Sequence, residues 1–200
     1  MSQAYALSDS SHPPASLTGI PNGKLGMWLF LASEIMFFTG LIGAYVVLRW
    51  SHPHWPGSEG HLSVALGTLN TLILICSSTT IVMALAASAQ NAITRARAWL
   101  VATIGLGAAF LVVKLGVEYA SKFSHHILPS TNVFWSCYYA LTGFHALHVL
   151  GGILFNLWVL RQTFGQARWR AQRHRLELAG LYWHFVDIVW IFLFPLLYLF

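Results

Sequence analysis

The stretch GLYWHFVDIVWIFLF, residues 180–194, decides the fold class, because it is almost wholly apolar and aromatic. Despite this character it carries a histidine, His184, and an aspartate, Asp187, three residues apart. An apolar segment of about 20 residues is the length that a helix needs to cross a bilayer. Ionisable side chains within such a helix are costly, and they persist where they have partners or a function.

The composition extends this interpretation to the whole chain. Of its 200 residues, 56% are hydrophobic and only 8% are charged, whereas soluble domains have about 25% charged residues. This places the chain in the membrane class. The two cysteines, Cys76 and Cys137, lie in separate apolar segments, form no CxxC motif, and are interpreted as buried core residues. The net charge of +5 comes from loops between apolar segments, so membrane topology explains it better than binding to nucleic acid.

Five segments are long and apolar enough to span a membrane. The sequence therefore predicts an all-α fold, a bundle of five transmembrane helices over residues 24–200. The first 23 residues are polar, contain three prolines and no apolar run, and are expected to form a tail. The predicted spans cover residues 25–48, 62–89, 98–119, 134–160 and 178–200.

The basic residues predict the orientation of the bundle. Most of them fall in loops on one side of the predicted membrane, which the positive-inside rule places inside, together with the N-terminus. The loop RQTFGQARWRAQRHRLE, residues 161–177, is the most basic segment. It is interpreted as a topology determinant that touches anionic headgroups, with a docking surface as the alternative. The residues expected inside are Lys24, Arg95, Arg97, Arg161, Arg168, Arg170, Arg173 and Arg175, and those expected outside are Arg49 and Lys122.

Two pairs of polar residues inside the spans have simple structural explanations. Lys114 and Glu118 are four residues apart on one helical face and are expected to form an ion pair near the outer end of their span. There the lysine can also extend its ammonium towards water. His184 and Asp187 also share a face, and the carboxylate is expected to accept a hydrogen bond from the imidazole and fix its tautomer.

Glu34 is the most unusual residue, because no cation lies within four residues of it along its own helix. It lies about 15 Å into its span beyond Lys24 at 1.5 Å per residue. A carboxyl at that depth is expected to be protonated and to need an acceptor on another helix. His148, which shares a helical face with His145, and the His184/Asp187 pair lie at a comparable depth. We therefore expect a polar layer that links the first, fourth and fifth spans.

Other functions remain open from the residues alone. Two helices that each offer an i, i+3 pair can hold a metal ion, so the HxxH and HxxD pairs could form a metal or haem site in an independent membrane protein. Such sites usually have more carboxylates than Asp187 and Glu34 provide. A small proton-conducting transporter centred on Glu34 is a third alternative. The sequence contains no GxGxxG, phosphate-loop, HExxH or nucleophile-elbow motif.

Four dispersed motifs resemble those of subunit III of the cytochrome c oxidases, within the haem–copper oxidase superfamily. They are SEIMFFTGL, VEYASKF, TGFHALHVLGG and YWHFVDIVWIFLF, and they occur in one order over nearly the whole chain. The mitochondrial form has seven helices, whereas this chain has five predicted spans, so the resemblance is to the shorter bacterial form.

The resemblance implies a multi-pass accessory subunit of a bacterial plasma membrane oxidase. Such a subunit carries no haem or copper; these belong to the partner subunits, here subunits I and II. It packs against the catalytic subunit, holds phospholipid in a cleft, stabilises the catalytic core during turnover and supports proton uptake. The complex reduces oxygen to water with electrons from cytochrome c and pumps protons. Because relatives serve quinol oxidases and nitric oxide reductases, those assignments stay open as alternatives.

The resemblance also assigns roles to individual residues. Glu34 matches a buried glutamate that reacts with a carbodiimide, and Arg161 matches an arginine at the level of the lipid headgroups. With two helices fewer than the long form, one wall of the lipid cleft is absent. The two histidine-bearing motifs are expected to form an interhelical polar cluster that consists of His145, His148, His184 and Asp187.

Overall fold

The computed structural model of the chain describes residues 21–57, 62–164 and 169–199, and these residues form an all-helical bundle. Five helical stretches are long and apolar enough to cross a membrane, which confirms the predicted fold class. The third stretch runs through an α-helix, a π-helical segment and a short α-helix. Most of the predicted N-terminal tail and Arg168 lie outside the described residues. The elements are α1 (Asn22–Ser51), α2 (Val64–Ala89), α3 (Ile93–Leu111), η1 (Val112–Tyr119), α4 (Ala120–Ser124), α5 (Val133–Gln162) and α6 (Trp169–Tyr198).

Every span except the second begins before the apolar segment that predicts it, whereas α2 begins at Val64 instead of residue 62. The largest difference is at α6, which begins at Trp169 instead of residue 178 and so includes part of the basic loop. Apolarity marks the part of a helix inside the hydrocarbon, whereas backbone hydrogen bonding continues into the headgroup region. Two helix starts are set by side-chain caps, since Ser63 accepts a hydrogen bond from the Leu66 N–H and Asn132 accepts one from the Trp135 N–H.

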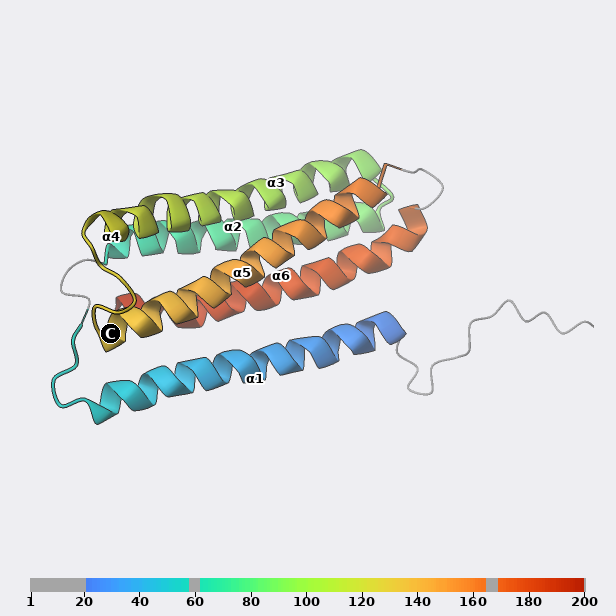
Figure 1. The fold of residues 1–200 in the computed structure, drawn as a ribbon. Helices are drawn as coiled ribbons and strands as arrows, with labels where there is room; N and C mark the ends of the chain where they lie inside the picture. Colours follow the sequence, from blue (N-terminus) through green and yellow to red (C-terminus); the bar gives the residue numbers. More distant parts are fainter. Residues whose placement is uncertain (1–20, 58–61, 165–168, 200) are drawn as a thin grey trace, which may run out of the picture.

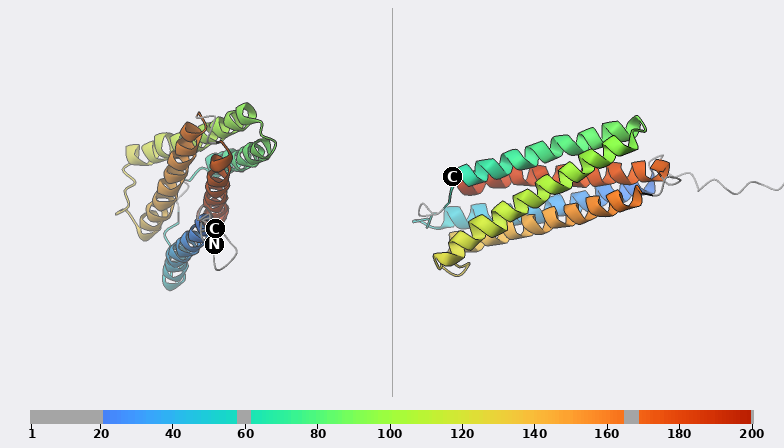
Figure 2. Two further views of the ribbon diagram at one scale, coloured as in Figure 1. Left: turned by 90° about the vertical axis from the view of Figure 1, so that its right-hand side faces the viewer. Right: turned by 90° about the horizontal axis from the view of Figure 1, so that it is seen from above.

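Four of the spans form a ring, and the first span lies outside it. Helix α2 packs against α3 and α6, while α5 packs against α3 and α6. Helix α1 contacts α6 and α5 along one edge of the bundle (Figures 1 and 2). Consequently only 17% of the most apolar part of α1 is buried, against 56% for α6. Cys76 on α2 is exposed, so the prediction that both cysteines are buried was wrong for this residue.

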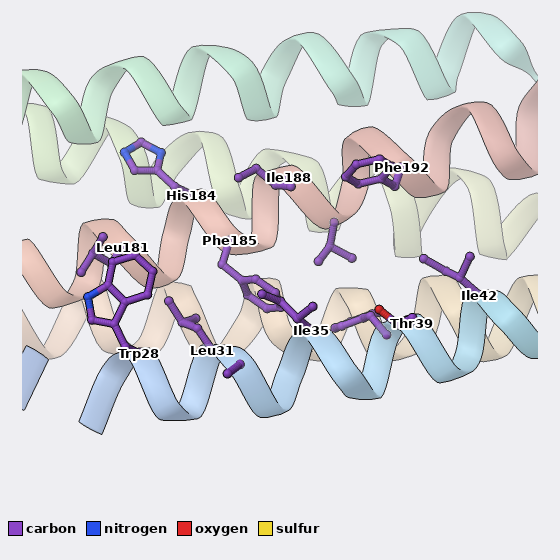
Figure 3. Close-up of a pocket in the computed structure, with 13 residues that line it drawn as sticks. Trp28, Leu31, Ile35, Thr39, Ile42, Leu181, His184, Phe185, Ile188 and Phe192 are labelled. Atoms are coloured by element: carbon purple, nitrogen blue, oxygen red, sulfur yellow. The ribbon is translucent and has the colours of Figure 1, made fainter. Parts of the chain in front are cut away.

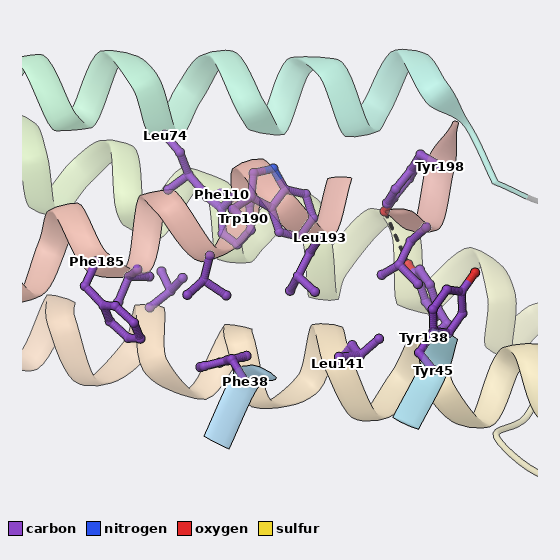
Figure 4. Packing of buried hydrophobic residues seen from close by; sticks show 14 of the residues in the cluster. Phe38, Tyr45, Leu74, Phe110, Tyr138, Leu141, Phe185, Trp190, Leu193 and Tyr198 are labelled. Carbon is purple, nitrogen blue, oxygen red and sulfur yellow. Dashed lines mark hydrogen bonds between the residues drawn. The ribbon is translucent and has the colours of Figure 1, made fainter. Parts of the chain in front are cut away.

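The core is aromatic and is centred on α6 (Figure 4). Trp190 of α6, Phe110 of α3 and Tyr138 of α5 are almost fully buried, and so is Trp183 of α6. Two glycines make room for Trp183: a Cβ added to Gly107 would lie 2.5 Å from its ring, and one added to Gly152 would lie 2.8 Å from it. At these two positions the absence of a side chain leaves room for the Trp183 ring of α6.

We expect Gly107→Ala to destabilise the bundle by about 1–3 kcal/mol, the usual cost of overpacking, because the rigid Trp183 ring cannot give way. Gly105→Ala is the matched control on the same helix, since nothing lies within 4 Å of an added Cβ there. Thermal unfolding in detergent, followed by tryptophan fluorescence, measures both. Equal midpoints for the two variants would show that Trp183 is loosely packed.

Candidate functional site

The most extensive polar arrangement is a buried ionic cluster near the ends of η1 and α6. We define it as Lys114, Glu118, Lys122, Tyr138 and Tyr198. One oxygen of Glu118 lies 3.0 Å from Lys114 Nζ, and the other lies 3.0 Å from Lys122 Nζ. The Tyr138 hydroxyl donates to Glu118 at 2.7 Å, and the Tyr198 hydroxyl also donates to it. The cluster thus ties the third span to α5 and to the end of α6.

The sequence indicated only part of this cluster. Lys114 and Glu118 are paired, but Lys114 is fully buried and does not extend towards water as expected. Lys122, which was expected outside, is also buried. Its position four residues after Glu118 indicates the second ion pair, but this spacing was not used to predict it. Both residues of the first pair lie on π-helical η1, a geometry that is often found at functional sites.

The ionic cluster carries two ammonium groups for one carboxylate. Aromatic rings surround the excess positive charge: Lys114 Nζ lies 4.7 Å from the centre of the Tyr138 ring and 5.1 Å from that of Trp190. Lys122 Nζ lies 5.7 Å from the ring centre of Trp135. A ring face attracts a cation within about 6 Å, so these contacts partly replace the missing second anion.

Glu34 has its hydrogen-bond partner on another helix. Its Oε2 lies 2.9 Å from Nε2 of His148, so the pair joins α1 to α5. The His148 Nδ1 lies 2.7 Å from the carbonyl of Phe144, which can only accept, so Nδ1 carries a hydrogen. A neutral His148 then accepts from a protonated Glu34, and a cationic His148 donates to an ionised Glu34. Either way the pair holds one proton between the two helices.

The expected contact between His184 and Asp187 is not formed. His184 Nδ1 instead lies 2.7 Å from the Ser78 hydroxyl, so this residue joins α6 to α2 and not to the Glu34–His148 pair. Neither carboxyl oxygen of Asp187 has a hydrogen-bond partner among the described residues. Helical spacing of three residues separates two side chains by about 60° around the axis, which is enough for them to face different neighbours.

His145 also lies apart from the other expected members of the polar cluster. It is buried between the rings of Phe110 and Trp190, with centroid distances of 5.7 and 5.1 Å, and neither ring nitrogen has a partner in the described part of the chain. The prediction of a single four-residue cluster was therefore wrong. Within the described ranges no three His, Cys, Asp or Glu residues lie close enough to hold a metal ion, so the HxxH and HxxD pairs are not brought together.

The opposite end of the bundle carries cations that bind across helices. Lys24 lies 2.8 Å from Glu177 and joins the start of α1 to α6. Arg97 at the start of α3 donates to the Thr163 side chain at 3.0 Å and stacks over the Phe164 ring. Arg161 is exposed in the last turn of α5, at this same end.

An apolar groove of about 410 Å³ lies between α1 and α6. Figure 3 shows Leu31 and Ile35 of α1 facing Phe185 and Leu181 of α6 across it. Nearly all of its lining side chains are hydrocarbon or aromatic, with Thr39 and His184 as the polar exceptions. A groove of this chemistry suits an acyl chain.

Comparison with known proteins identifies the family. The family model described as "Cytochrome c oxidase subunit III" matches residues 6–200. "Cytochrome c oxidase subunit 3" of Thermostichus vulcanus is 40% identical over 88% of this chain and 86% of its own length. Two further proteins of that name are similar. The one from Synechocystis sp. is 41% identical over 87% of this chain and 74% of its own length. The one from Alkalihalophilus pseudofirmus is 31% identical over 94% of this chain and 92% of its own length. Together with the five spans, these matches show that the chain belongs to the cytochrome c oxidase subunit III family.

Proposed function

We propose that this chain stabilises the catalytic subunit of a cytochrome c oxidase, binds phospholipid beside it and supports its uptake of protons. Membership of the family makes the chain an accessory subunit of a multi-subunit oxidase and a multi-pass protein of the bacterial inner membrane. The match along nearly the whole chain carries the proposal. The expected partners are subunits I and II, which would hold the haem and copper, and the expected electron donor is cytochrome c.

The distribution of cations supports the proposed orientation. The starts of α1, α3 and α6 and the end of α5 lie at one end of the bundle (Figure 1). Lys24, Arg97, Arg161 and Arg173 are at this end. The positive-inside rule supports assigning this end to the cytoplasm and the N-terminus to the inside.

The two proposed activities rest on separate features. The groove between α1 and α6 would hold an acyl chain, with the headgroup near Arg161 at the cytoplasmic end. The Glu34–His148 pair holds one exchangeable proton, and its side chains are 20% and 16% exposed, so it lies within reach of the surface of α1. A proton held there would support uptake by a neighbouring catalytic subunit.

Purification of the oxidase with and without this chain tests the function. A tag on the chain should recover haem-containing partners in mild detergent. The depleted complex should keep its initial rate of oxygen reduction with reduced cytochrome c and lose activity over repeated turnover. Recovery of the chain without any haem protein would refute the proposal, and faster oxidation of quinol than of cytochrome c would favour the quinol oxidase alternative.

Arg161→Ala should lower the amount of anionic phospholipid that co-purifies and shorten the functional lifetime of the oxidase. One cation near an anionic surface contributes about 1 kcal/mol, which corresponds to roughly a fivefold loss of lipid affinity. Arg95→Ala is the control, because Arg95 is an exposed cation at the same end but on α3. Lipid phosphorus and turnover number measure the effect. Equal values for both variants would show that Arg161 does not bind a lipid headgroup.

A further inference from the structure

A second groove, of about 350 Å³, lies between α2 and α6 next to the first one, with which it shares the lining residues His184 and Ile188. Its surface is mostly apolar, but it has more polar lining residues than the first groove: five of its ten are Thr71, Ser78, Thr79, His184 and Asp187. Its rim includes Ile188 and Ile191, which are 52% and 49% exposed. Thr71 and Thr79 donate to backbone carbonyls of α2, and Ser78 is bonded to His184. Asp187 is the one polar lining residue that needs an explanation, because lipid tails offer no hydrogen bonds.

The groove lies near the middle of the membrane. Asp187 is about 15 Å along α6 from Glu177 and about the same distance from Tyr198 at 1.5 Å per residue. Glu177 lies at the proposed cytoplasmic end, where it pairs with Lys24, and the hydrocarbon core is about 30 Å thick. Phospholipid headgroups therefore do not reach Asp187.

Asp187 differs from the other polar residues along the seam between α2 and α6. Trp183 and Trp190 donate to Ser77 and Thr71 of α2, each at 3.0 Å. Ser78 lies close to Asp187 and its hydroxyl is 2.7 Å from Nδ1 of His184, but it forms no hydrogen bond of normal geometry with either Asp187 oxygen. The Asp187 side chain is only 6% exposed, and both its oxygens lack a hydrogen bond among the described residues.

An unpaired carboxyl destabilises the chain that buries it, so the chain taken alone gains nothing from Asp187. In a membrane, such a group finds its partner on a neighbouring helix. We propose that a transmembrane helix of another subunit docks in the groove between α2 and α6 and donates a hydrogen bond to Asp187. Asp187 lines this groove, and the proposed hydrogen bond requires its side chain to turn one oxygen towards the docked helix. This inference rests on the proposed function, because it requires a partner subunit.

The first test separates stability from assembly. Asp187→Leu should leave the unfolding midpoint of the isolated subunit in detergent unchanged or raised, because it removes an unpaired carboxyl. The same variant should be lost from the purified oxidase about fivefold faster during detergent washing. Asp187→Asn is the matched control, since its carbonyl still accepts a hydrogen bond, and it should be retained like the wild type. Retention of Asp187→Leu equal to that of the wild type would overturn the proposal.

The second test asks what occupies the groove. A benzophenone amino acid in place of Ile191 should crosslink to a partner subunit in the purified complex, at a transmembrane segment with a hydrogen-bond donor within one turn. The same group in place of Val101, which is 54% exposed on α3 and outside the groove, serves as the comparison. Two results would refute this inference: crosslinking of position 191 to lipid and to no protein, or crosslinking to a partner segment that is wholly apolar. Failure of the chain to co-purify with any oxidase would instead refute the proposed function.

Discussion

Replacing Glu118 with glutamine is expected to prevent the bundle from accumulating in the membrane. Glu118 is the only carboxylate in the ionic cluster, and the variant leaves Lys114 and Lys122 buried with no anion between them. Removing one partner of a buried ion pair costs about 3–5 kcal/mol, a large share of the 5–15 kcal/mol that typically separates folded from unfolded states. Subunit content of purified membranes and the unfolding midpoint in detergent measure the loss.

Lys122→Met is the matched control for this prediction. It removes the excess positive charge and leaves Lys114 and Glu118 as a neutral pair, with the Tyr138 and Tyr198 hydroxyls still bound to Glu118. We expect a cost below about 1 kcal/mol, because a methionine fills the same space next to the Trp135 ring. If Glu118→Gln unfolds like the wild type, or if Lys122→Met is equally damaging, charge balance does not explain the cluster.

The five spans could be predicted because the bilayer imposes one rule on every segment: about 20 apolar residues must follow one another. The ends of the helices could not, because a helix continues into polar residues once it leaves the hydrocarbon, as α6 does from Trp169. Lys114 and Glu118 could be paired from their spacing, since both lie on one helix. Tyr198 could not be assigned to the same cluster, because its contact depends on how α6 packs against η1.

The partners of the histidines show the same limit. Comparable depth made His148 a candidate acceptor for Glu34, and the two are in contact. The same reasoning failed for His184, which is near the same depth but faces Ser78 on α2. Depth follows from counting residues along a helix, whereas the direction of a side chain depends on the rotation of that helix in the bundle. An i, i+3 spacing therefore did not show that His184 and Asp187 bind each other.

We expect Glu34 to be the principal carboxyl of this chain that a membrane-soluble carbodiimide modifies. The reagent needs a protonated carboxyl that it can reach. The Glu34 side chain is 20% exposed, and in one of the two arrangements with His148 it carries the shared proton. Glu118 is held by two ammonium groups and two hydroxyls, which favours its ionised form. The reagent cannot reach the oxygens of Asp187, because they are covered. The hydrogen bond from His184 that the sequence suggested, which would have kept this carboxyl ionised, is not formed.

Glu34→Gln should assemble and reduce oxygen at nearly the wild-type rate, because the amide N–H can donate to His148 Nε2 in place of the carboxyl. It should resist the carbodiimide and lower the ratio of protons pumped to electrons transferred, since the amide cannot release a proton. Mass-spectrometric mapping after carbodiimide treatment, together with oxygen uptake and proton release by the variant in vesicles, measures these effects. Modification mainly at Asp187 or Glu118 would show that access and pairing do not control the reaction. Near-complete loss of oxygen reduction in Glu34→Gln would mean that this carboxyl serves the chemistry directly, and it would return the proton-channel interpretation to first place.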